Sequence, residues 1–495
     1  MTDQTIVSTI IKNGKLCPDK IAITTGLLPN IETITYANLS KKILQASEFL
    51  SLNGVLPGEI VILSAPQSIA FIVGYFATHL LGATAVPVDI QLTPSQLRYI
   101  SDECKAKIIF LNSENSIKNM PKVLPLSSLL NTGCNELPQR DFPNLNYCAD
   151  ILFTSGTTGN PKGVMLTHEN ILESSKNINA FIKNTSKDLE ILPSPLSHSF
   201  GLARLRCNFL VGASIALVNG FLLPGKIFKL LKETKATGIS FVPAGAAVLL
   251  KFGEDKLATF SKQLKYIEMG SAPMPIKQKQ KLMQLLPNTK ICMHYGSTEA
   301  SRSCFIEFHK DKHYLNSVGK VTPGIDLKIQ NENGKECEAN ESGEIIVSGK
   351  SVSKKYLSSN IPIKDDWFMT GDYGYRNEQG YIFLSARKKD LINVGGRKVS
   401  PVEIENMINL IPSILECACI GVPDPKYISG EVIKTFLVLN NCKINRYSQI
   451  SDVDLVLYLR KNLEPYKIPS EFKWIDKIPK TSSGKIQRDV LRKNF

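Results

Sequence analysis

The sequence predicts a large α/β domain followed by a smaller α+β domain, and three observations lead to this fold class. Through the first 385 residues, apolar runs of strand length alternate with helical patterns, which is typical of largely parallel sheets. From Leu327 to Lys350 the pattern changes to short strands with Gly and Asn turns. A charged run, Ala386–Asp390, then separates this part from a compact α+β stretch. A chain of 495 residues is also too long to fold around a single hydrophobic core, so two or more domains are expected.

The large domain, residues 1–385, begins with a strand–helix–strand unit. Glu59–Ser64 predicts a buried strand, Ile69–Leu81 a helix and Ala83–Val88 a second strand. The stretch from Ile60 to Val88 carries no charge, but its helical part is too short to span a bilayer, so no transmembrane segment is expected. Further strands are expected at Lys107–Leu111, Ala149–Phe153, Ser214–Val218, Gly238–Val242 and Lys290–His294. The change of pattern near Leu327 predicts a β-rich subdomain over about residues 325–385.

The C-terminal domain, residues 391–495, is expected to follow a connection at residues 386–390. Ser400-Pro401-Val402-Glu403 has the form of a capping box with Pro at the first helical position, so a helix begins there. Ile414–Val422 and Val432–Leu439 predict strands, and Val453–Leu463 predicts a helix.

Composition and charge narrow the class of protein. Met1–Lys12 lacks the pattern of a secretory signal, and eleven cysteines without metal-ligand spacing or a disulfide framework favour reduced thiols in a cytoplasmic protein. From Arg376 to Phe495 there are 20 Lys and Arg against 13 Asp and Glu. Such a basic surface attracts nucleotides, coenzyme A, an acidic carrier protein or nucleic acid, or is simply solvated. No nucleic-acid partner is expected, because no recognised module and no basic stretch interleaved with aromatic residues occurs.

A loop rich in hydroxyls and glycine follows the strand Ala149–Phe153. Its sequence, Thr154-Ser155-Gly156-Thr157-Thr158-Gly159-Asn160-Pro161-Lys162-Gly163, offers backbone N–H groups, hydroxyls and a cation that suit a polyphosphate. A Walker A loop ends in Gly-Lys-Ser/Thr and opens a helix. Here Pro161 and Gly163 flank Lys162, and Val164–Leu166 predicts a strand, so a P-loop kinase is disfavoured.

This loop resembles the phosphate loop of the adenylate-forming superfamily, which includes acyl-CoA synthetases, adenylation domains of nonribosomal peptide synthetases and luciferases. Further motifs follow in the family's order, and together they cover nearly the whole chain. The resemblance implies two mixed or parallel sheets flanked by helices, and a mobile C-terminal domain on a hinge. It also implies ATP- and Mg²⁺-dependent activation of a small carboxylic acid as an acyl-adenylate. Transfer to a thiol would follow, with release of AMP and pyrophosphate.

The resemblance assigns roles to residues outside the loop. Tyr295-Gly296-Ser297-Thr298-Glu299 is similar to the family's second signature, in which Glu299 holds Mg²⁺ and Thr298 and Glu299 are catalytic. Thr370-Gly371-Asp372 and Arg387 resemble the ribose contacts, and Lys485, within Pro479–Ile486, resembles the adenylation lysine. The implied ATP-binding residues are Thr154, Ser155, Gly156, Thr157, Thr158, Gly159, Lys162, Ser271, Ala272, Pro273, Tyr295, Gly296, Ser297, Asp372 and Arg387.

Lys389 resembles the hinge position, although Ala386 stands where the family usually has Gly. Gly395-Gly396 resembles the strip that lines the tunnel for the thiol arm. The acceptor is left open between coenzyme A and a holo-carrier protein, and a ligase that passes the acyl group to an amine or an oxygen is a further alternative. A non-catalytic relative is disfavoured, because every charged signature residue is present.

The acid-binding residues are expected around the segment Pro195–Leu202. No Asp or Glu occurs from Leu192 to Lys229, so the ammonium of an α-amino acid would stay unpaired, which disfavours an amino-acid adenylation enzyme. His198 resembles the histidine that gates or lines the acyl site, with a structural core histidine as the alternative. Arg204 and Arg206 leave two readings open: they bind the carboxylate of a polar acid, or they pair at the sheet edge. The implied acyl pocket comprises Phe200, Phe241, Val242, Pro243 and Gly270.

Overall fold

The computed structural model describes residues 5–26, 31–112, 120–131, 140–154, 161–220, 224–387, 390–395, 397–425, 431–440, 451–480 and 486–494. The chain divides into two compact units, which are described separately. Unit 1 comprises Met1–Leu327 and Val347–Phe368, and unit 2 comprises Lys328–Ile346 and Met369–Phe495. The domain limits expected from the sequence, residues 1–385 and 391–495 with a hinge at 386–390, are not tested by this division and remain a prediction.

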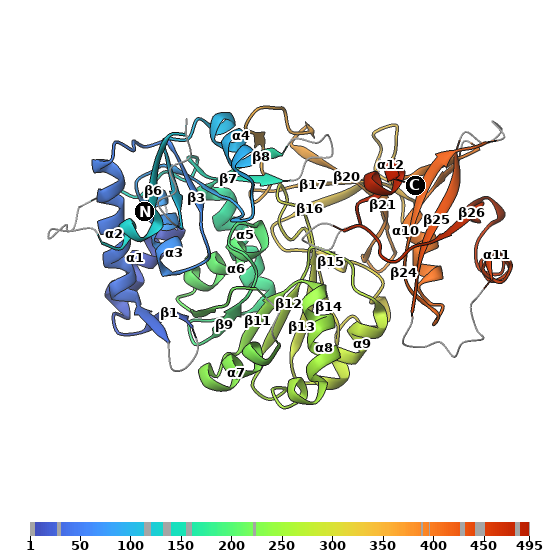
Figure 1. The fold of residues 1–495 in the computed structure, drawn as a ribbon, viewed down its shortest axis with the longest axis horizontal. Coiled ribbons are helices and arrows are strands. Elements are labelled where there is room, and N and C mark those ends of the chain that lie inside the picture. Colours follow the sequence, from blue (N-terminus) through green and yellow to red (C-terminus); the bar gives the residue numbers. More distant parts are fainter. Residues whose placement is uncertain are drawn as a thin grey trace. The chain divides into compact units, whose positions relative to one another are not determined.

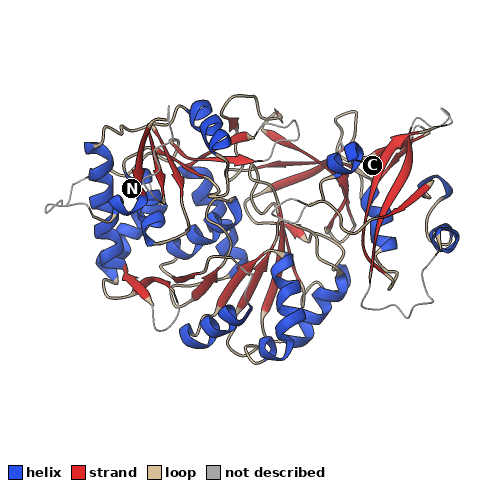
Figure 2. Cartoon of the chain, viewed as in Figure 1, coloured by secondary structure: helices blue, strands red, loops and turns tan. Residues whose placement is uncertain are grey.

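The larger sheet of unit 1 has nine strands among the described residues (Figures 1 and 2). Its centre, from β1 through β10, β9, β11 and β12 to β13, is parallel, and antiparallel strands close both edges. In sheet order the strands are β15 (Lys320–Val321), β14 (Cys304–Glu307), β13 (Lys290–Tyr295), β12 (Tyr266–Met269), β11 (Gly238–Phe241), β9 (Leu189–Leu192), β10 (Ser214–Leu217), β1 (Ile21–Thr25) and β2 (Glu32–Thr35).

A second sheet in the described part of the chain has seven strands, parallel from β7 through β4 and β3 to β5 and β6. Antiparallel β8 and β18 extend it beyond β7. In order the strands are β18 (Lys355–Tyr356), β8 (Lys162–Thr167), β7 (Cys148–Thr154), β4 (Thr84–Pro87), β3 (Ile60–Ser64), β5 (Ile108–Leu111) and β6 (Lys122–Pro125).

Helices cover these sheets and connect them. α5 contacts β7 and β8 of the smaller sheet, α6 contacts β9 and β10 of the larger one, and the two helices pack on each other. Figure 1 shows α7, α8 and α9 beside β11–β13. The helices of unit 1 are α1 (Ile6–Leu16), α2 (Tyr36–Leu52), α3 (Ile69–Leu80), α4 (Pro94–Cys104), α5 (His168–Ile182), α6 (Ser199–Leu210), α7 (Pro224–Thr234), α8 (Pro243–Ala258) and α9 (Ile276–Leu285), with short 3₁₀ turns at Leu126–Leu129 and Lys312–Tyr314.

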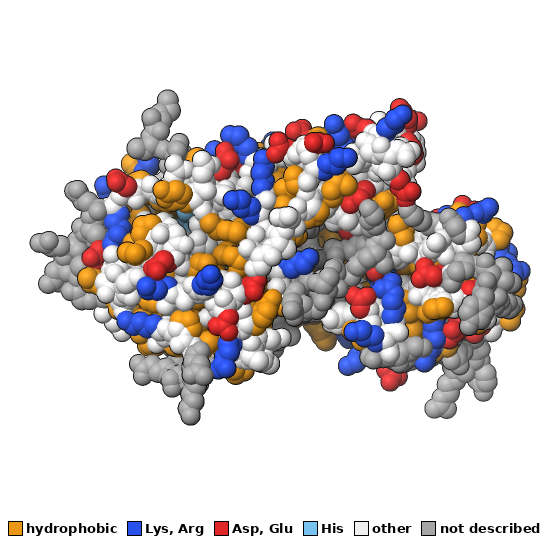
Figure 3. Space-filling model, turned by 90° about the horizontal axis from the view of Figure 1, so that it is seen from above, with side chains coloured by type: hydrophobic (Ala, Val, Ile, Leu, Met, Phe, Trp, Pro, Cys, Tyr) orange, Lys and Arg blue, Asp and Glu red, His pale blue; other side chains and the backbone are white. Residues whose placement is uncertain are grey.

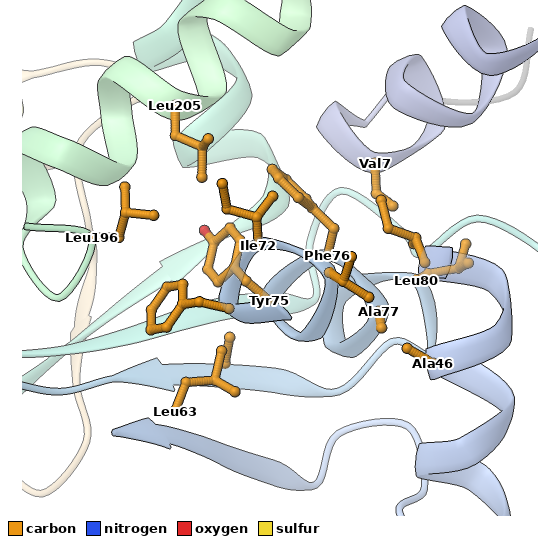
Figure 4. Close-up of a cluster of buried hydrophobic side chains, with 14 of the residues drawn as sticks. Val7, Ala46, Leu63, Ile72, Tyr75, Phe76, Ala77, Leu80, Leu196 and Leu205 are labelled. Atoms are coloured by element: carbon orange, nitrogen blue, oxygen red, sulfur yellow. The ribbon is translucent and has the colours of Figure 1, made fainter. Parts of the chain in front are cut away.

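α3 is apolar on all sides and is buried along its whole length, as expected for a helix without a polar face. The Oγ of Ser68 caps it by accepting a hydrogen bond from the backbone N–H of Phe71. Figure 4 shows α3 with Val7 and Ala46 on one side, Leu196 and Leu205 on the other, and Leu63 beneath. This cluster joins α1, α2, α3, α6 and β3 into one core.

Unit 2 contains the antiparallel pair β24 (Ile414–Pro423) and β25 (Glu431–Leu439), with β26 (Glu471–Trp474) parallel to β25. β22 (Ile392–Val394) and β23 (Arg397–Val399) form a hairpin. The unit limits fall inside strands of a five-stranded sheet made of β16 (Asp326–Gln330), β17 (Gly343–Ser348), β19 (Ile363–Lys364), β20 (Trp367–Arg376) and β21 (Ile382–Arg387). The helices are α10 (Pro401–Ile408), α11 (Asp452–Arg460) and α12 (Arg488–Asn494), with a 3₁₀ turn at Pro465–Lys467.

The predicted fold class is confirmed, and the differences are local. The Oγ of Ser400 caps α10, but the carboxylate of Glu403 accepts a hydrogen bond from Lys467 Nζ at 2.7 Å. β21 continues to Arg387, so the first two residues of the predicted hinge are paired with β20. Within the described ranges, every helix is too short or too polar to cross a membrane. On the face shown in Figure 3, Lys and Arg side chains are interspersed with Asp and Glu.

Candidate active site

The predicted phosphate loop connects β7 to β8, which are antiparallel neighbours. Thr154 and Lys162 face each other in this pair, and Thr154 Oγ1 donates to the carbonyl oxygen of Lys162 at 3.5 Å. The two ends of the loop are therefore held one strand spacing apart. Five predicted ATP-binding residues lie between these ends, outside the described residues: Ser155, Gly156, Thr157, Thr158 and Gly159.

Tyr356 links the lysine of this loop to the predicted metal ligand. Its hydroxyl donates a 2.7 Å hydrogen bond to Glu299 Oε1, and Lys162 Nζ lies 5.7 Å from the centre of its ring. Burial and the charge of Glu299 raise the pKa of this hydroxyl well above its ordinary value, so it remains a donor. No sequence pattern singled out Tyr356. The structure thus brings Lys162 and Glu299 together through a residue that sequence reasoning missed.

The second signature forms a tight turn directly after β13. Ser297 N–H donates to the carbonyl of Ala300 at 3.1 Å, and Ser297 Oγ accepts from Ala300 N–H at 3.3 Å. A Cβ on Gly296 would lie 2.5 Å from the backbone nitrogen of Arg302, so only glycine fits this turn. Thr298 lines a cavity of about 10 Å³ whose other polar walls are Asn170, Ser174, Ser199, Arg206, Ser301 and Ser351.

Predicted nucleotide and acyl residues converge at the carboxyl ends of three parallel strands. Phe241 ends β11 beside Met269, which ends β12, and Met269 pairs with Met293 of β13. Ligands bind at this end of open parallel sheets. Tyr295 is half-buried at the end of β13. Val242 is half-buried between β11 and α8, and Pro243 is buried at the start of α8.

Gly270 and Phe200 meet around the ring of His294. A Cβ on Gly270 would lie 2.1 Å from two atoms of this ring, so the glycine makes room for the imidazole. The ring of Phe200 packs edge-on against it, with 5.0 Å between centroids. Burial lowers the pKa of His294 to about 4, so the imidazole is neutral near pH 7. The next residue, Ser271, has φ +72°, which turns the segment Ser271–Pro273 away from β12; Ser271 and Ala272 are half-buried and Pro273 is exposed.

Arg204 is fully buried and pairs with two carboxylates. Its Nε and Nη2 donate to the two oxygens of Glu190 at 3.0 and 2.5 Å, and its Nη1 lies 3.1 Å from Glu268 Oε2. Arg302 Nε donates to Glu268 Oε1 at 3.1 Å. Burial alone would raise the pKa of Glu268, but Arg302 and Arg204 hold it well below its ordinary value. These charges balance one another inside the protein.

Arg206 also pairs with a buried carboxylate inside the protein. It donates to the hydroxyl of Tyr75 at 2.9 and 2.6 Å and pairs with Asp150, which also contacts His79 at 3.0 Å. Of the two readings of Arg204 and Arg206, the structure supports pairing within the protein. The pairing is in the core and not at a sheet edge, and both guanidinium groups are buried away from solvent.

His198 occupies the N-cap position of α6, but its side chain makes no capping bond. The imidazole is 49% exposed, and its Nε2 lies 3.8 Å from Asp89 Oδ2. Partial burial lowers its pKa, and the charge of Asp89 opposes this. His198 is therefore an accessible group and not a core histidine.

The predicted ribose contacts belong to unit 2. Asp372 of β20 pairs with Arg387 of β21 in backbone register. Thr370 Oγ1 donates to the carbonyl of Ile345 at 2.6 Å and accepts from Asp372 N–H at 3.1 Å, while Gly371 has φ +70°. These bonds fix the turn that presents Asp372. The Arg387 side chain lies outside the described residues.

The remaining predicted residues of unit 2 lie in or beside segments that the structure does not describe. Gly395 has φ +59° at the turn of the β22–β23 hairpin. Lys389, Gly396 and Lys485 lie outside the described residues. A bridge between Lys480 and Ile486 joins the two ends of the segment that contains Lys485.

The groups near Glu299 fit magnesium bound to a polyphosphate. The described residues contain no cluster of three or more His, Cys, Asp or Glu side chains that would hold a metal alone. Magnesium bound with a nucleotide needs only one or two carboxylates, since phosphates and water supply its other oxygens. Glu299 offers one half-buried carboxylate, and Lys162 offers a cation nearby for the phosphates.

Comparison with known proteins gives matches along the whole chain. The family model described as AMP-binding enzyme matches residues 12–357, and the one described as AMP-binding enzyme C-terminal domain matches residues 403–485. Oxalate–CoA ligase of Arabidopsis thaliana is 30% identical, over 100% of this chain and 99% of that protein. Feruloyl-CoA synthase of an Amycolatopsis species is 27% identical, with both chains fully covered.

Two solved structures are similar over 99% of both chains. One is o-succinylbenzoate CoA synthetase from Bacillus subtilis in complex with its acyl-adenylate intermediate, with a TM-score of 0.87 and 25% identity. The other is ATP-bound MatB from Rhodopseudomonas palustris, with a TM-score of 0.87 and 26% identity.

Proposed function

Because the chain belongs to the AMP-binding enzyme family, we propose that it uses ATP to activate a carboxylic acid as an acyl-adenylate and passes the acyl group to coenzyme A. In the first half-reaction a carboxylate oxygen attacks the α-phosphorus and pyrophosphate leaves. In the second, the thiol attacks the acyl carbonyl carbon, its proton passes to solvent, and AMP leaves. The observation that carries this proposal is the cluster of Lys162, Tyr356 and Glu299 beside the ends of the loop after β7.

The residues of unit 1 hold the leaving group. Two anions must meet in the first half-reaction, so their repulsion is the main barrier, and fixed positive charge lowers it. Lys162, with the loop from Thr154, binds the β- and γ-phosphates, and Glu299 would hold Mg²⁺, which supplies positive charge to the phosphate oxygens. Ser297 keeps the signature turn in shape beside them, and the hydroxyl of Thr298 is proposed to bond a phosphate. Neither half-reaction needs a nucleophile from the protein.

The other predicted residues bind the nucleoside and the acid. Tyr295, with Ser271, Ala272 and Pro273, is proposed to lie along the adenine, and Asp372 with Arg387 to bind the ribose hydroxyls. Lys485 is proposed to neutralise charge between the carboxylate and the α-phosphate. Lys389 remains the proposed hinge, and Gly395 with Gly396 the proposed path of the thiol arm.

We propose an acid without an α-amino group. Glu190 and Glu268, two buried carboxylates of the sheet that carries Phe241 and Gly270, are both neutralised by buried arginines, so neither is available to an ammonium. The relatives named above act on oxalate and ferulate, which carry no amine. The acyl site is proposed at Phe200, Phe241, Val242, Pro243 and Gly270, with accessible His198 at its entrance.

The experiment that tests the reaction is ATP–pyrophosphate exchange with aryl, dicarboxylic, fatty and amino acids. Exchange is expected with at least one of the first three classes, and no exchange with any acid would refute the proposal. Lys485→Ala should lower exchange by about 10²–10³, the scale for removing one stabilising donor. It should leave thioester formation from supplied acyl-adenylate largely intact.

The acceptor is tested separately. Thioester yield with coenzyme A is compared with the yield on a holo-carrier protein, and coenzyme A is expected because the named relatives are CoA ligases. A product formed on the carrier protein alone would replace coenzyme A in the proposal and leave adenylation unaffected.

A further inference from the structure

We propose that Tyr356 is a positioning residue that separates Lys162 from Glu299 and leaves both charges available to magnesium-bound ATP. This inference rests on the proposed function. It concerns a residue that contacts both predicted phosphate-binding groups, yet none of the motifs contains it.

The strand register of the seven-stranded sheet places Tyr356 beside Lys162. β18 is antiparallel to β8, and Tyr356 lies opposite Val164. Residues i and i+2 of a strand point to the same face, so Lys162 is a diagonal neighbour of Tyr356 on that face. This explains why the ammonium lies over the ring, 5.7 Å from its centre.

The segment that contains Tyr356 is also fixed to Glu299. Ser353 N–H donates to the carbonyl oxygen of Glu299 at 2.8 Å, and Ser353 Oγ donates to the carbonyl of Met165 in β8 at 2.7 Å. Leu357 N–H donates to the carbonyl of Gly163 at 2.8 Å. The backbone on both sides of Tyr356 is therefore bonded to β8 or to the signature turn, and the tyrosine cannot shift without breaking these bonds.

The hydroxyl and the ring have different effects. The hydroxyl donates to Oε1 of Glu299, which fixes the carboxylate and leaves Oε2 to face a metal. The ring gives the Lys162 ammonium a weak partner. In the described part of the chain, Lys162 and Glu299 form no ion pair with each other, although both lie against Tyr356. A direct ion pair would have to be broken whenever the nucleotide binds.

Tyr356→Phe tests the hydroxyl while keeping the ring. The readout is calorimetric binding of a non-hydrolysable ATP analogue to the full chain, with Mg²⁺ and with EDTA. Losing one hydrogen bond to a carboxylate should weaken binding with Mg²⁺ by about 10-fold and leave binding in EDTA unchanged. Tyr356→Leu removes the ring as well, so that Lys162 can pair with Glu299, and it should weaken binding under both conditions.

Tyr147→Phe is the matched control, since Tyr147 is 54% exposed and is not among the predicted site residues. It should match the wild type under both conditions. In a Glu299→Gln background, Tyr356→Phe should have little further effect, because the hydroxyl acts through the carboxylate.

Two results would overturn the inference. One is unchanged Mg²⁺-dependent binding in Tyr356→Phe. The other is an equal loss with and without Mg²⁺ together with a lowered melting temperature, which would indicate a purely structural role. Pyrophosphate exchange by the wild type keeps these outcomes separate from failure of the proposed function, because that failure appears without any substitution.

Discussion

Replacing Arg204 by methionine tests whether this buried arginine serves the fold or the substrate. Arg204 makes two hydrogen bonds to Glu190 and lies 3.1 Å from Glu268. Arg204→Met keeps most of the volume but removes the positive charge, so the group of two glutamates and two arginines gains a net negative charge. Removing one partner of a buried ion pair costs about 3–5 kcal/mol of unfolding free energy.

The remaining hydrogen bonds set where in that range the loss should fall. Glu190 keeps Asn208 Nδ2 at 2.7 Å and the hydroxyl of Tyr266 at 2.8 Å, and Glu268 keeps Arg302. Each charge retains a partner, so we expect the lower half of the range, about 3–4 kcal/mol.

The assay is urea unfolding at pH 7, followed by far-UV circular dichroism and extrapolated to water. Arg460→Met, at an exposed position at the end of α11, is the control and should change the unfolding free energy by about 0.5 kcal/mol or less. Adding Glu190→Gln to Arg204→Met should recover part of the loss, because it removes the uncompensated charge.

A loss of unfolding free energy below about 1 kcal/mol would refute the structural role, since it falls well short of the roughly 3–5 kcal/mol for removing one partner of a buried ion pair. If, in addition, KM for the acid rose while stability did not change, Arg204 would bind the substrate carboxylate. The same experiment thus decides between the two readings that the sequence left open.

Three further predictions concern other buried groups. Gly270→Ala should cost about 1–3 kcal/mol of unfolding free energy, because its Cβ would lie 2.1 Å from the His294 ring; thermal unfolding measures this. Arg488→Met should cost about 3 kcal/mol, because the nearly buried carboxylate of Glu405 loses a 2.5 Å hydrogen bond; urea unfolding measures the loss and its partial rescue by Glu405→Gln. Burial lowers the pKa of His294 to about 4 and that of His168 to about 3, so the unfolded chain binds more protons below pH 6.5. The stability that each histidine contributes is therefore present above pH 6.5 and is lost as the pH falls. Each should lower the unfolding free energy by about 2 kcal/mol between pH 7 and pH 5, which urea unfolding at the two pH values measures.

Each of these predictions has an outcome that contradicts it. An unchanged melting temperature in Gly270→Ala would mean that the His294 ring moves freely. Equal losses from Arg488→Met and from Arg488→Lys would mean that the charge on residue 488 is unimportant. If His168→Gln combined with His294→Gln leaves the fall in stability between pH 7 and pH 5 unchanged, these histidines do not cause it.

The fold could be predicted because parallel strands buried on both faces appear as short, largely apolar runs. Glu59–Ser64 and Gly238–Val242 are such runs, and they correspond to β3 and β11 to within one residue at either end. The family and the class of enzyme, an AMP-forming carboxylate–thiol ligase, were also predicted from motif order, and the family match and the related CoA ligases confirm them.

Side-chain partners across the sheets could not be predicted. The sequence left the partner of Arg204 open, and that partner, Glu190, lies in β9 and faces Arg204 across the β9–α6 connection. Tyr356 belongs to a strand of only two residues, whose register depends on β8 almost 200 positions earlier. No local pattern contains such information, because the partners meet only after the sheet has formed.

The two halves of the proposed site depend on different sheets. Lys162 and Tyr356 lie on paired strands of the seven-stranded sheet, whereas Phe241 and Gly270 lie at or directly after strand ends of the nine-stranded one. Glu299 follows β13 by four residues and is bonded to Tyr356, so it connects the two. In the proposed site, changes at the strand ends would alter acid binding without moving the groups proposed to hold phosphate. Relatives named for oxalate and for ferulate both match the full chain, at 30% and 27% identity, which agrees with such a separation. Within the proposed site, the hydrogen bond between Tyr356 and Glu299 is the contact that joins the two sheets.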